Sequence, residues 1–132
     1  MKFDYIRLIR SFEEHGSSSG YWACCRSESL RVLRILRFMQ TTDDWVPLSV
    51  ILPHAQCSLT SLRRTVWLLH GKMRVEAVLN GKAKTLVDGA ILALKQAAYN
   101  PRNHYVKGKK YYRPTLYVKR GSDLKGIPES PI

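Results

Sequence analysis

The stretch WVPLSVILPHAQCSLTSLRRTVWLLHGKMRVEAVLNGKAKTLV, residues 45–87, decides the fold that the sequence predicts. It begins with signals for a short helix over 48–52, which Pro53 should end because its ring clashes with the preceding turn. A second helix is expected over 58–70, since a serine can cap its start and a glycine follows its end. Asn80-Gly81 then separates two strand-like runs and is typical of a tight hairpin turn. The stretch therefore predicts helix, turn, helix and hairpin.

The helix expected over 58–70 has two chemically different faces. Its predicted core face, which spans about 80° at 100° per residue, consists of Leu59, Leu62, Val66 and Leu69. Its other side and flank carry hydroxyl, arginine, tryptophan and leucine side chains, namely Thr60, Ser61, Arg63, Arg64, Trp67 and Leu68. Short hydroxyl residues followed by arginines suit contacts to phosphates and base edges. The same pattern also fits an ordinary surface helix or a face that packs on another subunit.

The hairpin expected at Asn80-Gly81 brings two lysines together. Lys82 and Lys84 should point to one face just beyond the tip, because side chains two apart on a strand share a face. Alternatively, the preceding helix continues as far as Gly81. Gly71 would then lie inside that helix and weaken it.

Upstream of this stretch the chain predicts two further helices. Residues 27–40 combine a possible serine cap at Ser27 with a broad apolar face, which is typical of an amphipathic helix packed on a core. Arginines recur at every third position and mark its solvated side: Arg31, Arg34 and Arg37. Residues 3–14 have near-helical apolar spacing and predict a shorter amphipathic helix.

Downstream, residues 90–99 are rich in good helix formers and predict a fourth helix, although residues 87–90 could instead form another hairpin turn. Residues 104–120 interleave tyrosines with lysines and arginines and contain no acid. Gly108 offers a turn, and Pro114 favours an edge strand, so this segment predicts a basic, aromatic β-hairpin. Such a surface can neutralise phosphates and stack on bases, and tyrosine-rich strands also form for purely structural reasons.

The net charge of +12 belongs to one part of the chain. Residues 45–122 carry fourteen basic residues against Glu76 and Asp88, a net of +12, whereas residues 1–44 have a net of only +1. A field of one sign on this scale favours a polyanionic partner, nucleic acid before an anionic membrane surface. A basic field can also serve solubility alone.

Cysteine and histidine are too few and too scattered to indicate a metal site or a catalytic centre. Of the three cysteines, Cys24 and Cys25 are adjacent, and an odd count of this kind does not fit a secreted disulfide framework. His54 and Cys57 have the spacing of one pair of zinc ligands, which falls short of a structural site. With no glycine-rich phosphate loop and no nucleophile-elbow motif, we expect no enzyme, no metal and no cofactor.

Length and hydropathy fit one domain outside the membrane. A chain of 132 residues with 45% apolar residues can bury a core without disulfides. No apolar run reaches the roughly 18 residues of a membrane-spanning helix, and the N-terminus is charged where a signal peptide would be apolar. We therefore expect a cytoplasmic protein, associated with the nucleoid in a bacterium or phage.

The order of elements across residues 27–87 resembles a winged helix-turn-helix domain. The resemblance lies in the pattern of elements rather than in a sequence motif, and it covers a little under half of the chain. It implies an α+β fold with a winged helix-turn-helix core, flanked by an N-terminal helix and a C-terminal basic, aromatic β-hairpin. The expected single domain spans 1–122, with an N-terminal flank over 1–26, a C-terminal extension over 88–122 and a flexible tail over 123–132.

The resemblance also implies roles for the helix and the hairpin. The helix over 58–70 would enter the major groove of DNA, and the hairpin would follow the backbone or the minor groove. Together with other basic positions, the predicted nucleic-acid-binding residues are Thr60, Ser61, Arg63, Arg64, Trp67, Lys72, Lys82, Lys84, Lys107, Lys109, Lys110 and Arg113.

Three functions from different classes fit these observations. The first is a sequence-specific protein for double-stranded DNA, a small transcriptional regulator that acts as a homodimer through its flanking elements. The second is a replication, partition or RNA-binding accessory protein that holds single strands. The third is a small basic protein-interaction or inhibitor module with an acidic partner.

Overall fold

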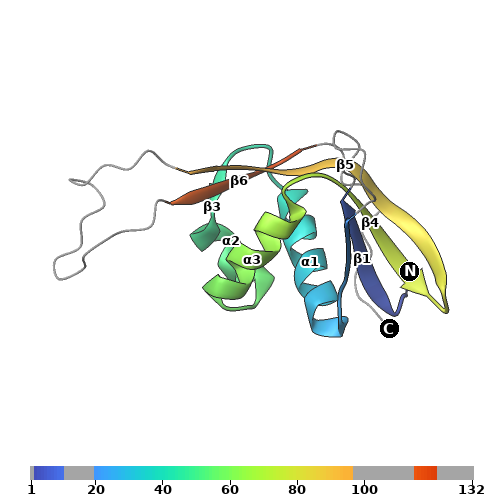
Figure 1. Cartoon of the computed structure of the whole chain (residues 1–132). Coiled ribbons are helices and arrows are strands. Elements are labelled where there is room, and N and C mark those ends of the chain that lie inside the picture. Colours follow the sequence, from blue (N-terminus) through green and yellow to red (C-terminus); the bar gives the residue numbers. More distant parts are fainter. Residues whose placement is uncertain (1, 11–19, 97–114, 122–132) are drawn as a thin grey trace, which may run out of the picture.

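The computed structural model describes residues 2–10, 20–96 and 115–121. In chain order its elements are β1 (Tyr5–Arg10), β2 (Gly20–Ala23), α1 (Arg26–Met39), β3 (Val46–Pro47), α2 (Leu48–Ala55), α3 (Leu59–Leu69), β4 (Gly71–Leu79), β5 (Lys82–Gln96) and β6 (Leu116–Arg120). The strands form one antiparallel sheet in the order β2-β1-β4-β5-β6-β3. Helices α1, α2 and α3 lie together on one side of this sheet (Figure 1). The fold is therefore α+β.

The core lies between the helices and the sheet face that they cover. α1 contributes its apolar face, which is almost fully buried and consists of Val32, Leu33, Ile35, Leu36 and Met39. The strands contribute alternate residues, such as Ile6 and Leu8 of β1 and Leu116 and Val118 of β6. Because strand side chains alternate between faces, the residues between these point away from the helices.

The helix predicted over 27–40 is confirmed as α1, with a different cap. Its N-cap is Cys25 and not Ser27, and the Cys25 backbone N–H donates to Glu28 Oε2 at 3.4 Å. Ser27 instead lies in the first turn, where its Oγ is 3.2 Å from Cys25 Sγ. Glu28 in the first turn therefore accepts a hydrogen bond from the cap residue, and its negative charge also interacts favourably with the helix dipole.

The short helix α2 extends further than the sequence predicts. Pro53 lies inside it and does not end it, because the helix continues to Ala55. The missing proline N–H removes one hydrogen bond close to the end of the helix, where Ile51 and Ala55 remain fully buried in the core. Gln56 then closes the helix in the left-handed conformation, with φ 52°, and its N–H donates to the Leu52 carbonyl at 3.2 Å.

The β4–β5 hairpin confirms the turn at Asn80-Gly81. Leu79 pairs with Lys82 across the turn, and φ is 51° at Asn80 and 79° at Gly81. These paired positive angles fit a two-residue turn of the kind that Asn-Gly favours. The alternative of one continuous helix is wrong, because α3 ends at Leu69 before a strand begins.

The helix predicted over 3–14 is wrong where the structure describes it, since Tyr5–Arg10 form β1. Ile6 is opposite Ala77 and Leu8 is opposite Val75 in β4, and all four side chains face the core. The apolar positions of this segment fit a period of two as well as a helix. The neighbouring strand decides between them, because it supplies hydrogen bonds and apolar contacts.

The helix predicted from residue 90 is also wrong as far as Gln96, because β5 runs through this segment. The first part of β5 pairs with β4 and its last part with β6, where Leu94 is opposite Val118. Pairing on the sheet therefore overrides the helix propensity of the alanines. Residues 97–99 lie outside the described residues.

The basic, aromatic hairpin predicted over 104–120 is described only at its second strand, which is β6. β6 pairs with β5 on one side and with β3 on the other, where Tyr117 is opposite Pro47 and Val118 opposite Val46. Its described neighbours are thus strands from distant parts of the chain. The predicted turn at Gly108 lies outside the described residues.

Candidate nucleic-acid interface

The inward side of α3 is set by the core. Ser58 caps the helix by accepting a hydrogen bond from the Ser61 backbone N–H at 3.2 Å. The predicted core face is confirmed for Leu62, Val66 and Leu69, all fully buried. It is wrong for Leu59, which is 49% exposed because it begins the helix beyond the edge of the core. These contacts fix which side of α3 faces outward.

The outward face of α3 carries the side chains that the sequence singles out. Thr60, Arg64 and Trp67 are exposed, and Trp67 retains 46% of its surface. Their spacing of four and three residues places them on one stripe of the helix. Arg63 is half-buried on the flank, and Leu68, also predicted on the outward side, instead packs against the core. The structure therefore brings Thr60, Arg64 and Trp67 together on one surface.

This surface contains no acidic side chain from its own or the adjoining segments. The sequence has no Asp or Glu between Asp44 and Glu76. Among the described residues, the ion pairs join Arg7 and Arg74 to Glu76 and Arg120 to Asp43, and neither arginine of α3 takes part in one. The positive charge of α3 is therefore available to an external anion.

Ser61 is half-exposed and also takes part in hydrogen bonds that stabilise the N-terminus of α3. The Ser58 hydroxyl donates to Ser61 Oγ at 3.1 Å, and the Ser61 carbonyl accepts from Thr65 Oγ1 at 2.9 Å. Its hydroxyl thus belongs to the cap of α3. Of the predicted contacts on this helix, Ser61 is the one most engaged within the protein.

Two arginines from other elements hold α3 in place. Arg10 of β1 donates to the Trp67 carbonyl at 3.4 Å and the Leu68 carbonyl at 3.2 Å, at the end of the helix where a cation is favoured. Arg31 of α1 donates to Thr65 Oγ1 at 3.3 Å. The sequence places Arg31 on a solvated stripe, but it is half-buried against α3. Neither contact has a signal in the sequence, since both depend on packing between distant segments.

The two hairpin lysines lie on the opposite flank of the molecule from α3. Lys82 and Lys84 are exposed, and α1 lies between α3 and the tip of the hairpin (Figure 1). His70, directly after α3, bonds to the Leu92 carbonyl through Nδ1 at 3.1 Å. Leu92 is ten residues beyond Lys82, a separation of about 30 Å along a strand. The structure therefore does not join the hairpin tip to the outward face of α3.

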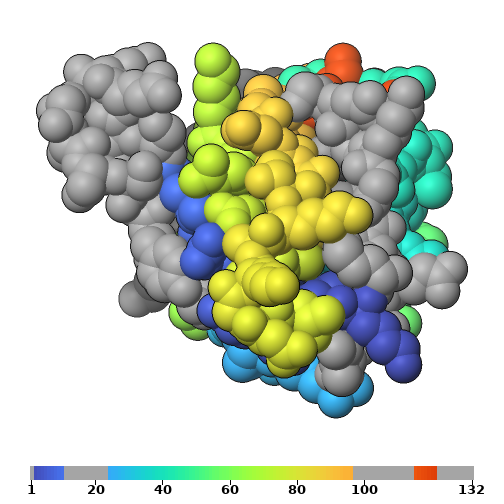
Figure 2. Space-filling model, turned by 90° about the vertical axis from the view of Figure 1, so that its right-hand side faces the viewer, coloured from blue at the N-terminus to red at the C-terminus, as the bar shows by residue number. Residues whose placement is uncertain are grey.

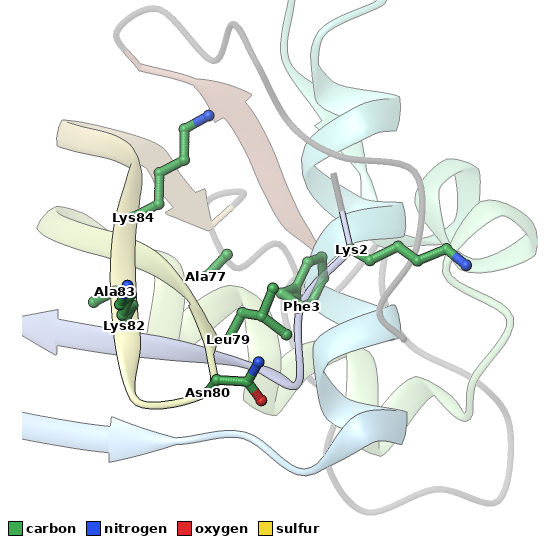
Figure 3. Close-up of a pocket in the computed structure, with 8 residues that line it drawn as sticks. All are labelled: Lys2, Phe3, Ala77, Leu79, Asn80, Lys82, Ala83 and Lys84. Carbon is green, nitrogen blue, oxygen red and sulfur yellow. The ribbon is translucent and has the colours of Figure 1, made fainter.

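The hairpin forms the front of the molecule when it is viewed from its own side (Figure 2). Beneath its tip is a hollow with an apolar lining from Phe3, Ala77, Leu79 and Ala83 (Figure 3). Lysines also line it, but the side chains of Lys2 and Lys84 extend in different directions (Figure 3). Their charges do not converge on one point within the hollow.

A second basic and aromatic cluster lies at the other end of the sheet. Lys95 Nζ is 4.5 Å from the ring centroid of Trp45 and 5.9 Å from that of Tyr117, and Lys119 Nζ is 5.9 Å from the Trp45 ring. We call these four residues the Trp45 patch. Sequence reasoning missed Trp45 and Lys95 because only the strand order β5-β6-β3 brings them together.

The other predicted basic residues divide into two groups. Lys72 is exposed on β4, opposite Ala90 of β5. The remaining four lie outside the described residues: Lys107, Lys109, Lys110 and Arg113.

Thiol and imidazole groups in the described part of the chain do not gather into a metal-binding cluster of three or more ligands. The His54 ring stacks on Phe38 with 4.3 Å between centroids. Burial raises the pKa of the Cys24 thiol to about 12, whereas a hydrogen bond with the Ser27 side chain lowers the pKa of the exposed Cys25. None of the helices in the described ranges could span a membrane on length and hydropathy.

Comparison of the chain with protein-family models, with curated proteins and with solved structures found no match.

Proposed function

We propose that the chain is a sequence-specific binding protein for double-stranded DNA and that α3 enters the major groove. The observation that supports this proposal is the outward face of α3, where Thr60, Arg64 and Trp67 are exposed on one stripe without an acidic neighbour in the surrounding sequence. The cap at Ser58 and the two arginine contacts hold this stripe in a fixed direction. A rigid element is what base readout requires.

The dimensions of α3 suit this role. An α-helix with its side chains is about 10–12 Å across and fits the major groove, which is about 12 Å wide, and the eleven residues of α3 make a helix about 16 Å long. Arg64 is the residue assigned to a guanine edge, because a guanidinium can donate two parallel hydrogen bonds to it. Arg63 is assigned to a flanking phosphate, and Thr60 to a base edge or phosphate near the start of the helix.

The rest of the proposal follows the resemblance to winged helix-turn-helix domains. In it the chain is a small transcriptional regulator that binds DNA as a homodimer. Because Lys82 and Lys84 lie on the opposite flank from α3, we assign them nonspecific phosphate contacts outside the α3 footprint. This assignment departs from a wing that works beside the recognition helix.

Selection of bound sequences from a random duplex pool tests the proposal. Enrichment of a defined sequence is expected, and a palindromic consensus would further support a two-fold dimer. Binding that is strong at low salt but enriches no sequence would contradict base readout by α3.

A protein-interaction module is the second candidate, and one observation favours it. Val50 of α2 is 44% exposed, and Leu59 and Trp67 of α3 are exposed to a similar degree. Exposed tryptophan beside arginine is also the composition of protein-binding hot spots. Unchanged gel mobility of duplex fragments at low salt would favour this candidate over DNA binding.

A further inference from the structure

The Trp45 patch lies on the side of the sheet that the helices leave uncovered. Leu116 and Val118 of β6 are buried against the core, so Tyr117 and Lys119, which alternate with them, point the other way. Lys95 is opposite Tyr117 in the strand register and shares its face. Strands β5 and β6 and the residue directly before β3 thus place two ammonium groups and two aromatic rings on one face of the sheet.

The charges of this patch differ from those at the other end of the same sheet. There, Glu76 forms ion pairs with both Arg7 and Arg74, at 2.7 and 3.0 Å. Within the described residues neither Lys95 nor Lys119 forms an ion pair. Both ammonium groups instead lie over the Trp45 ring, which attracts a cation without neutralising it.

This combination of groups fits a polymer that carries both phosphates and flat rings. A phosphate binds an ammonium group more strongly than an exposed aromatic ring does, so a lysine can leave the Trp45 ring for a phosphate. The ring face that the ammonium then uncovers can stack on a base. Bases in a duplex are already stacked on each other, whereas those of a single strand can be splayed onto an open sheet.

We propose that the Trp45 patch binds single-stranded nucleic acid, with Lys95 and Lys119 on successive phosphates and a base stacked on Trp45. This surface is separate from the outward face of α3, so it can bind whether or not α3 reads duplex DNA. Binding of a single strand to the Trp45 patch depends on base stacking and on two charges, and this binding requires no defined sequence.

Fluorescence anisotropy of the full chain with labelled single strands of about 15 nucleotides tests the proposal. Thymidylate and uridylate oligomers are both used, because the patch recognises phosphate and base rather than a particular sugar. Binding of either oligomer is expected, with an affinity that falls as salt rises. Failure to bind both at low salt would overturn the proposal.

The Trp45→Ala variant isolates the stacking contact. It should lose affinity for the single strand on the order of tenfold and keep its affinity for duplex DNA. Trp67→Ala is the matched control, since it removes a second tryptophan from a different surface. Equal losses of single-strand binding in the two variants would contradict a role specific to Trp45.

An abasic oligomer tests the same contact without changing the protein. The native chain should bind it roughly tenfold more weakly than thymidylate, because phosphates remain while the stacking base is absent. Equal affinity for the two oligomers would overturn the stacking, even if Trp45→Ala failed to fold. The double variant Lys95→Ala, Lys119→Ala should lower the slope of log affinity against log salt by about 1.4, and an unchanged slope would contradict the phosphate contacts.

Discussion

The outward face of α3 and the Trp45 patch are both cationic and aromatic, but they are assembled differently. The α3 face consists of side chains on successive turns of one helix, and its direction is fixed by buried leucines and a capping serine. The Trp45 patch consists of side chains from β5, from β6 and from the residue directly before β3, which are far apart in the sequence. A helix face can therefore be read from periodicity, whereas a sheet face depends on which strands become neighbours.

The two regions also differ in how their cations are held. Arg63 and Arg64 project from a helix that Arg10 and Arg31 hold from outside. The lysines of the Trp45 patch instead lie over aromatic rings of the patch itself. We infer that the first region supports fixed geometry for base edges and the second a surface that adapts to a flexible strand.

The largest expected effect comes from breaking the support of α3. Leu62→Ala removes a fully buried side chain and should lower the free energy of unfolding by about 3 kcal/mol. Urea denaturation followed by circular dichroism measures this loss. Leu59→Ala, on the exposed side of the same helix, is the control and should change it by less than about 0.5 kcal/mol. Equal losses would contradict the orientation of α3.

A smaller effect is expected from the cap of α3. Ser58→Ala removes the acceptor for the Ser61 N–H and should cost about 1 kcal/mol of stability. Thermal unfolding should show a lower midpoint than in Ser49→Ala, which removes an exposed hydroxyl from inside α2. If Ser49→Ala lowered the midpoint as much, the capping role of Ser58 would be wrong.

The smallest effect is expected at the hairpin tip, because it lies away from both regions. The double variant Lys82→Ala, Lys84→Ala should reduce the salt slope of duplex binding by at most about 1.8 and weaken binding to every duplex alike. Mobility-shift titrations at several salt concentrations measure this slope. Loss confined to one sequence would show that the tip takes part in base readout, against its assignment to nonspecific contacts.

Local signals in the sequence are sufficient to predict those elements whose stabilising contacts lie within a few residues of each other. The turn at Asn80-Gly81 and the cap at Ser58 act within a few residues, and both are found where the sequence predicts them. The sequence predicts helices where the structure has β1 and the end of β5, because their apolar spacing and alanines fit either state. Their hydrogen bonds come from partners elsewhere in the chain, and no local pattern specifies that pairing.

The same distinction holds for the candidate sites. Thr60, Arg64 and Trp67 could be predicted as one outward stripe, because helical periodicity alone places them together. Trp45 and Lys95 could not, since their proximity depends on β6 lying between β5 and β3. Arg10 and Arg31 belong to this second kind, because their contacts with α3 arise only once the helices and the sheet pack.

Relative binding of Arg64→Ala to two duplexes tests the central claim most directly. One duplex carries the sequence selected from the random pool, the other a scrambled sequence of the same length, and both affinities are measured at one salt concentration. Base readout predicts that the variant loses on the order of tenfold more affinity for the selected duplex than for the scrambled one. Arg26→Ala, which removes an exposed charge from α1, is the matched control and should lose little affinity for either. Equal losses for both duplexes in Arg64→Ala would contradict the claim that α3 reads DNA sequence.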